Sequence, residues 1–355
     1  MPALRPLPAE PDDTLHAGAG RQRRVRHLLV LGGADDGGEI AREDLLELAD
    51  LAACRFPAAA LTTGPGPVGA VDPGVVTLSR HTTLVGPYGP GAGLRAPATA
   101  HVVDVLVPRE RGERALAGSA DPDGLARVFD AGLPVREELR VVDWLVAVAR
   151  RLHGTLVLAT DAGPVTLTPD PDALVDLTVH SDVWLDPEAA LATLRGVDAR
   201  VVYAPDGTDW GGPPETLRRE GLAISVLDDA DRAALHAEAD AFDVHHLTTP
   251  EQRTGYALHL DLGDDGLVAV EIGGEDTPPV SVTRHGWAAG GTVAYRLRWF
   301  PLDDDELLEE NPAPGHRVAR TRAAERMGRL ARALHAAVGG LVTDAADLPV
   351  HPEDL

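Results

Sequence analysis

The chain of 355 residues carries 56 aspartate and glutamate residues against 32 basic residues, all of them arginine, for a formal net charge of −24. So acidic a protein repels phosphates, which disfavours binding to nucleic acid. The absence of lysine excludes enzymes that need a Schiff-base, pyridoxal-phosphate or P-loop lysine, although GC-rich coding is the simpler explanation for that absence.

The length of the chain predicts two domains, because a single hydrophobic core rarely extends beyond about 250–300 residues. No apolar run approaches the roughly 18–20 residues that a membrane-spanning helix needs. Residues 1–20 also lack the apolar segment of a secretory signal peptide. We therefore expect a cytoplasmic protein that does not bind a membrane.

The first half of the chain begins with residues 1–24, which show no periodicity and are predicted to be a disordered tail. Alternating apolar residues then predict strands, and apolar residues at helical spacing predict helices. Residues 58–93 contain short apolar runs broken by proline and glycine, which indicates small strands and loops. The other elements expected here are strands Val25–Leu31, His101–Val107 and Thr155–Ala159, a helix beginning near Glu43, and a helix over Arg136–Leu152.

The second half repeats the order strand, helix, strand. Turns rich in glycine and aspartate separate successive apolar runs, as in an antiparallel meander. Each half is therefore predicted to be a mostly antiparallel sheet with helices packed on one face, which is an α+β arrangement. The elements expected in the second half are strands Tyr256–Leu262, Leu267–Ile272, Pro279–Arg284, Thr292–Phe300 and Leu341–Thr343, and a helix over His316–Val338.

Sequence letters recur along with these elements, since Thr160-Asp161-Ala162 and Thr343-Asp344-Ala345 each follow a helix, a glycine and a strand. Such self-similarity indicates a duplication, although this order of elements is common and could match by chance. We expect two tandem copies of one unit, at residues 25–196 and 197–355. The strand, helix and strand of each copy should then occupy equivalent positions in the two sheets.

Polar residues alternate with apolar residues over Val175–Asp186. Alternate residues of a strand share one face, so Asp176, His180 and Asp182 are expected to lie together. His180 and Asp182 could then bind a divalent metal or act as a general acid–base pair. A half-solvated strand produces the same alternation without any site, and that interpretation is the simpler one.

A glycine-rich turn, Gly32–Gly38, follows the first expected strand and leads towards a helix. Backbone amides in such a turn can hold a phosphate. Its glycine spacing fits neither the dinucleotide-binding fingerprint nor the P-loop, and Asp35 and Asp36 would repel a phosphate. We therefore expect a flexible turn, and no nucleotide or other cofactor.

Arginines gather in the last part of the chain. Arg322 and Arg326 lie on the polar face of the expected C-terminal helix, and Arg296 and Arg298 lie on the outward face of the preceding strand. Together they are candidates for an anion-binding site. They could equally pair with the acidic segment 303–310 of the same chain.

The sequence contains no cysteine pair, zinc-protease motif, nucleophile elbow or other known catalytic motif. These observations and the repeated architecture favour a non-catalytic interaction or regulatory protein that binds another protein and holds no metal and no cofactor. The alternative is a hydrolase or a metal-dependent enzyme that uses the polar strand face around His180 and Asp182, with Asp176 as a further candidate. A pocket lined by convergent ionisable groups would favour the enzyme.

Overall fold

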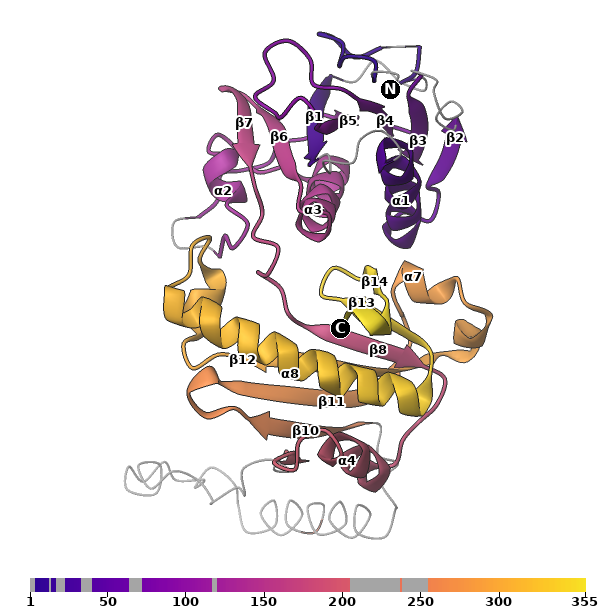
Figure 1. Cartoon of the computed structure of the whole chain (residues 1–355), viewed down its shortest axis with the longest axis vertical. Coiled ribbons are helices and arrows are strands. Elements are labelled where there is room, and N and C mark those ends of the chain that lie inside the picture. The colour runs from indigo at the N-terminus through magenta and orange to yellow at the C-terminus, as the bar shows by residue number, and fades with distance from the viewer. Residues whose placement is uncertain are drawn as a thin grey trace.

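The computed structural model describes residues 4–12, 14–16, 23–32, 40–63, 72–116, 120–204, 237 and 255–355. The described chain forms two units that follow one another along the long axis of the molecule (Figure 1). Each unit contains one seven-stranded sheet, and neighbouring strands in both sheets are antiparallel. The fold is therefore α+β with two sheet units, as the sequence predicted.

The first sheet has the strand order β2-β3-β4-β5-β1-β6-β7. Helices α1 and α3 bury Leu48 and Leu145 in one cluster with Leu29 of β1 and Val105 of β5. The elements of this unit are β1 Arg24–Leu31, α1 Ile40–Arg55, β2 Ala60–Thr63, β3 Gly74–Ser79, β4 Thr82–Tyr88, β5 His101–Pro108, α2 Leu125–Val128, α3 Arg136–Arg151, β6 Thr155–Thr160 and β7 Gly163–Leu167.

The second sheet has the order β14-β13-β8-β12-β11-β10-β9. Helix α8 buries Met327 and Leu334 with Val179 of β8 and Leu297 of β12, and α4 adds Leu194. The elements of this unit are β8 Leu177–Ser181, α4 Pro187–Arg195, β9 Val202–Tyr203, β10 Gly255–Asp261, η1 Gly263–Asp265, β11 Leu267–Glu275, α7 Val280–Thr283, η2 Gly286–Gly290, β12 Thr292–Phe300, η3 Asp304–Leu308, α8 Pro314–Val338, β13 Leu341–Asp344, β14 Pro349–Val350 and η4 Pro352–Asp354.

The two sheets share one connectivity. In each unit the first strand is central, lying between β5 and β6 in the first sheet and between β12 and β13 in the second. A helix and the strands of the meander follow, and then a long helix leads to the last two strands. β5, α3 and β6 thus correspond in order and position to β12, α8 and β13, which is the equivalence that a duplication predicts.

The sheets divide the chain between β7 and β8, whereas the expected boundary lay after residue 196. β8 is the central strand of the second sheet and pairs with β12 and β13. It ends at Ser181, well short of the strand expected over Val175–Asp186. The Ser181 hydroxyl donates to the carbonyl of Val338 at 2.8 Å and accepts the N–H of Val183 at 3.1 Å, which turns the chain away from the sheet.

The structure has no strand over Pro279–Arg284, where the sequence predicted one. Residues 280–283 form the short helix α7 instead. Two consecutive prolines, Pro278 and Pro279, precede it. Proline has no N–H to donate to a sheet ladder, and its fixed φ suits the start of a helix.

Residues 4–12 and 14–16 pack against the first sheet, contrary to the expected disordered tail. Leu7 and Leu15 contact an apolar cluster that includes Val85 and Tyr88, on the face opposite α1 and α3. The Leu7 N–H donates to the carbonyl of Gly89 at 2.9 Å. Apolar side chains within the polar stretch thus bury surface against the sheet.

The two units are joined by side chains as well as by the chain itself. Leu348, in the turn between β13 and β14 of the second unit, is buried in the core cluster of the first unit. Next to it, Arg55 Nη1 of α1 lies 3.0 Å from Asp347 Oδ2. No described helix is long and apolar enough to cross a membrane.

Candidate functional site

His180 lies on the face of the second sheet that is turned away from α8, and its exposed fraction is 2%. Its Nε2 is 3.2 Å from the Thr343 hydroxyl, and its Nδ1 is 3.1 Å from Glu275 Oε2. Arg296 donates to the other oxygen of Glu275 at 2.7 Å. Burial lowers the pKa of His180 in spite of the nearby Glu275 carboxylate, so the imidazole is neutral near pH 7.

Asp176 lines the same pocket as His180, whereas Asp182 does not. Asp182 lies beyond the end of β8 and is exposed. Asp176 precedes β8 and accepts the backbone N–H of Trp299 at 3.0 Å, while burial raises the pKa of its carboxyl group. The carboxylate beside His180 is Glu275, which strand alternation could not reveal because it comes from β11, two strands away.

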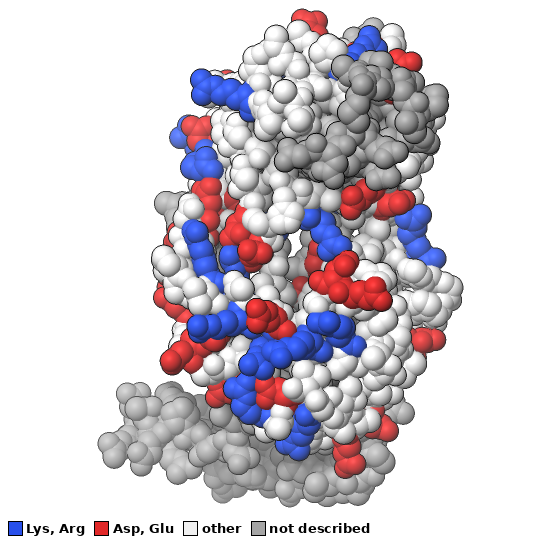
Figure 2. Space-filling view, viewed as in Figure 1, with Lys and Arg blue, Asp and Glu red and all other residues white. Residues whose placement is uncertain are grey.

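The four candidate anion-binding arginines lie on opposite sides of the second sheet. Arg296 and Arg298 project from β12 on the face away from α8, whereas Arg322 and Arg326 belong to α8 itself. Arginine and acidic side chains are interspersed over α8 in Figure 2. Each of the four candidate arginines has a carboxylate neighbour: Glu275 for Arg296, Glu271 for Arg298, Asp265 for Arg322 and Asp198 for Arg326. The structure therefore does not assemble them into one anion site.

The acidic segment 303–310 is not their partner either. Its Glu310 pairs with Arg127 of α2 in the first unit, with 2.6 Å between Arg127 Nη2 and Glu310 Oε1. The Arg127 side chain also lowers the pKa of the Glu310 carboxyl group. This segment thus forms a second ionic contact between the units.

Three adjoining pockets surround the linker between β7 and β8, and we call them together the interunit crevice. One, of about 390 Å³, lies between α3, the linker, α8 and β13. The second, of about 220 Å³, lies between the linker and η3. The third, of about 450 Å³, lies over the sheet face that carries His180 and Glu275. The second shares Leu174 with the first and Leu307 with the third, so the three pockets adjoin through common lining residues.

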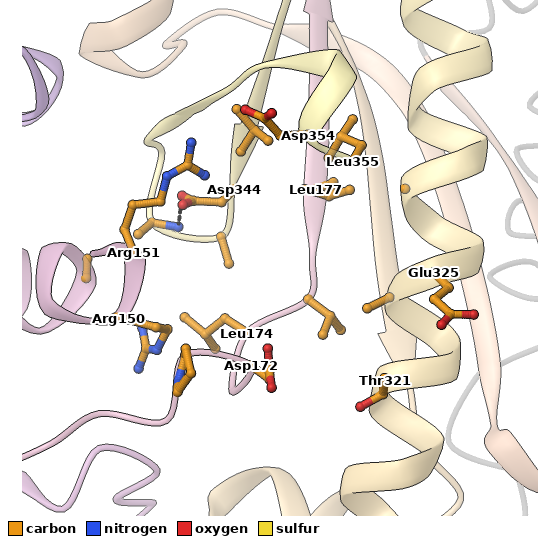
Figure 3. Close-up of a pocket in the computed structure, with 18 residues that line it drawn as sticks. Arg150, Arg151, Asp172, Leu174, Leu177, Thr321, Glu325, Asp344, Asp354 and Leu355 are labelled. Atoms are coloured by element: carbon orange, nitrogen blue, oxygen red, sulfur yellow. Dashed lines mark hydrogen bonds between the residues drawn. The ribbon is translucent and has the colours of Figure 1, made fainter. Parts of the chain in front are cut away.

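Figure 3 shows the first of these pockets in detail. Arg150 and Leu174 lie on one side of the hollow, and Thr321 and Glu325 of α8 lie on the other. Asp344 faces the hollow from β13 and accepts the backbone N–H groups of residues 346 and 348, each at 2.9 Å. Burial raises the pKa of the Asp344 carboxyl group.

Carboxylates outnumber arginines along the interunit crevice. Arg150, Arg296 and Arg320 are each already paired with a carboxylate of the chain. The acidic residues that line the crevice are Asp170, Asp172, Asp176, Glu275, Glu306, Glu309, Glu310, Glu325, Asp344, Asp347 and Asp354, and the arginines are Arg150, Arg151, Arg296, Arg298 and Arg320. The crevice is therefore net acidic.

No known protein family, curated protein or solved structure matches this chain. A function must therefore be inferred from the geometry of the crevice.

Large apolar side chains are exposed where η3 meets the crevice. Phe300 and Leu307 line the third pocket, and Leu302 and Leu308 lie in the same segment. The exposed fraction of Leu302 reaches 76%. The sequence pattern did not single these residues out. The signal that could have found them is the set of leucines among six acidic residues in 302–310, since so acidic a segment is expected to be exposed.

The described residues assemble no metal site. Within the described ranges, no group of three or more histidine, cysteine, aspartate or glutamate side chains is placed to hold a metal ion. In the glycine-rich turn Gly32–Gly38, only Gly32 belongs to the described residues, so the expectation for the rest of that turn lies outside them.

Proposed function

We propose that this protein is a non-catalytic protein-binding protein that holds a cationic, partly apolar segment of a partner in the interunit crevice. The excess of carboxylates over arginines along the crevice is the observation that carries the proposal. A cationic segment would neutralise those carboxylates, such as Asp172 and Glu309, that have no arginine partner within the described ranges. An anionic partner would meet repulsion and would have to displace arginines from their present carboxylates.

The exposed apolar side chains beside the crevice support the same proposal. Interfaces between proteins commonly combine an apolar centre with a polar rim. Phe300, Leu302, Leu307 and Leu308 form such an apolar group in one segment. Acidic residues at 303–306 and 309–310 surround it, so the segment offers both kinds of contact to a partner.

One observation favours the alternative hypothesis, that the protein is a hydrolase. Thr343, His180 and Glu275 are arranged as hydroxyl, imidazole and carboxylate, the order found in nucleophilic hydrolases. However, the exposed fraction of Thr343 is 1%, and its side chain does not line the adjoining pocket. A substrate could not reach this hydroxyl, and we therefore favour the binding function.

The proposal is tested with a short fluorescein-labelled peptide of alternating arginine and leucine, whose binding is followed by fluorescence anisotropy. We expect saturable binding that weakens about tenfold when Leu302 and Leu308 are both changed to serine, because truncating interface anchors costs on the order of 1–2 kcal/mol. Leu116→Ser is the matched control, since Leu116 is 80% exposed but lies in the first unit outside the crevice.

A second control separates specific binding from the general attraction of an acidic protein for cations. The same peptide with citrulline in place of arginine keeps the shape but loses the charge, and it should bind at least about tenfold more weakly. Equal weakening by the crevice variant and by Leu116→Ser, or no saturable binding at all, would show that the crevice is not the binding site.

A further inference from the structure

We propose that the first pocket of the interunit crevice holds one aromatic side chain of the partner, which has an arginine or a lysine on either side of it in the partner's sequence. This inference rests on the proposed function and names the residue of the partner that is buried. The pocket has a volume of about 390 Å³ and is lined by residues of α3, the linker, α8 and β13. A cavity of about 150 Å³ is enough to bind benzene, so this pocket has room for an aromatic side chain.

Short side chains leave this pocket open between α3 and α8. Thr321, Ala324 and Gly328 recur at helical spacing on the side of α8 that lines it. Ala147 of α3 and Ala346, in the turn between β13 and β14, line it as well. Because none of these side chains extends far from the backbone, the hollow between the two helices stays unfilled (Figure 3).

Larger apolar side chains form the remaining walls of the pocket. Val175 of the linker, Leu177 of β8 and Leu355 line it, and all three pack against the core of the second unit. Leu174, next to Val175, lines the pocket too and is 46% exposed. An aromatic ring that contacted these side chains would remove apolar surface from water, which favours binding.

Accessible carboxylates surround this apolar hollow. Asp172 of the linker, Glu325 of α8 and Asp354 of η4 line the pocket, and all three are exposed. Within the part of the chain that the structure describes, none of the three is paired with an arginine, and Arg150 of the same pocket pairs with Asp123 instead. Cationic residues on either side of the buried ring would therefore meet carboxylates that are free to bind them.

A series of fluorescein-labelled peptides, Arg-Arg-X-Arg-Arg, tests which side chain the wild-type protein binds. Glycine, leucine or phenylalanine is placed at X, and binding is followed by fluorescence anisotropy. We expect phenylalanine to bind at least about tenfold more tightly than glycine and about threefold more tightly than leucine, because the ring buries the most apolar surface. Leucine binding as tightly as phenylalanine, or no difference among the three peptides, would overturn the proposal.

Photo-crosslinking locates the ring on the wild-type protein. With p-benzoylphenylalanine at X, irradiation followed by mass spectrometry should place the crosslink on residues that line the pocket, such as Leu174, Val175 or Ala324. Crosslinks confined to residues 300–308 would place the ring elsewhere in the crevice and would contradict the proposal.

A matched pair of variants on α8 tests the pocket by filling it. Ala324→Phe should weaken binding of the phenylalanine peptide at least about tenfold, because its own ring takes the place of the ligand's. Ala333→Phe should change binding by less than about twofold, since Ala333 is also half-buried on α8 but does not line the pocket. Equal effects of the two variants would count against the pocket. If Ala324→Phe fails to fold, the crosslink in the wild type still decides the matter.

A pair of double variants tests the carboxylates. Asp172→Asn with Glu325→Gln should weaken binding of the phenylalanine peptide at least about fivefold. Asp264→Asn with Glu353→Gln removes the same charge at exposed positions that do not line the pocket, and it should change binding by less than about twofold. The same weakening in both would mean that only the overall charge of the protein attracts the peptide, which would contradict the proposal.

The arginine–leucine peptide separates failure of this pocket from failure of the proposed function. Binding of that peptide that requires Leu302 and Leu308, together with binding of the phenylalanine peptide that Ala324→Phe leaves unchanged, would reject the pocket and leave the protein-binding function standing. Loss of binding in Ala324→Phe, with Ala333→Phe unchanged, would support both.

Discussion

Glu138 shows how this acidic chain accommodates a carboxylate in its interior. Its side chain is 0% exposed, lies 2.7 Å from Arg111 Nη2 and accepts the backbone N–H of Glu110 at 2.6 Å. The guanidinium of Arg111 also stacks over the ring of Phe129 at 4.2 Å. Such a buried pair is tolerated only while each charge keeps its partners, because desolvation is costly.

Removing that carboxylate should therefore be strongly destabilising. Glu138→Ala leaves Arg111 buried without its counter-charge and should lower the free energy of unfolding by about 3–5 kcal/mol. Urea denaturation followed by circular dichroism measures the change. Glu113→Ala, at an exposed position in the same unit, should cost less than about 0.5 kcal/mol. Similar losses in both variants would contradict this account of Glu138.

His27, beside Glu138, makes stability depend on pH. Burial lowers the pKa of His27 from its ordinary value of 6.5, and Glu138 offsets only part of that effect. The unfolded chain therefore binds a proton that the folded chain does not, so stability is full above pH 6.5 and falls as the pH drops below it. The urea concentration at the unfolding midpoint should decrease when the pH is lowered from about 7.5 to about 5.5. His27→Gln should show a smaller decrease. An equal fall in the variant would rule His27 out as the cause.

At the scale of single elements, local patterns predicted much of the fold. The helix expected over Arg136–Leu152 is found at Arg136–Arg151, and the strand expected over Thr292–Phe300 has those bounds. Apolar periodicity and flanking glycine or proline are local signals, so a single sequence carries them. Consecutive prolines were also a local signal, and the strand predicted over Pro279–Arg284 neglected it.

The candidate site could be predicted only in part. Strand alternation singled out His180, but its neighbours Glu275 and Thr343 depend on which strands pair across the sheet. The crevice depends further on how the two units pack, and neither kind of contact between distant segments leaves a period in the sequence. The same reason explains why β8 was expected in the wrong unit.

The sharp turn between α8 and β13 sets the position of His180. Gly340 has a φ of 87°, and a Cβ there would overlap the carbonyl oxygen of His180. Gly340→Ala should lower the free energy of unfolding by roughly 2–4 kcal/mol through strain and overpacking. Gly315→Ala in α8, where a Cβ meets nothing within 4 Å, is the control and should be neutral or stabilising. Chemical denaturation of both variants decides the comparison.

At the scale of the whole molecule, the two units are coupled through the turn between β13 and β14. Leu348 of the second unit is 1% exposed within the core of the first. Arg151 of α3 donates to the carbonyl of Pro349 at 3.3 Å across the two units, and within the second unit Ser281 of α7 supports the turn by donating to the carbonyl of Asp347 at 3.0 Å. The first pocket of the interunit crevice, which α3 and α8 both line, therefore has walls that also meet in a packed contact.

Leu348 belongs to the second unit, but truncating its side chain should loosen the packing of the first unit. Leu348→Ala should cost about 2–5 kcal/mol, as for other large-to-small changes in a core. Hydrogen exchange followed by mass spectrometry should show faster exchange in α1 and α3, which contact the same cluster. Leu116→Ala, at an exposed position, is the control. Unchanged exchange in α1 and α3 would mean that the units are stabilised independently.

The shared connectivity of the two sheets also bears on how such a protein diverges. In the first unit, residues 4–12 and 14–16 pack against part of the face opposite the helices, whereas the corresponding face of the second unit carries the pocket beside His180. If one ancestral unit gave rise to both, this face came to pack against the chain itself in one copy and kept a pocket in the other. Changes in the pocket would then leave the packing of the first copy intact.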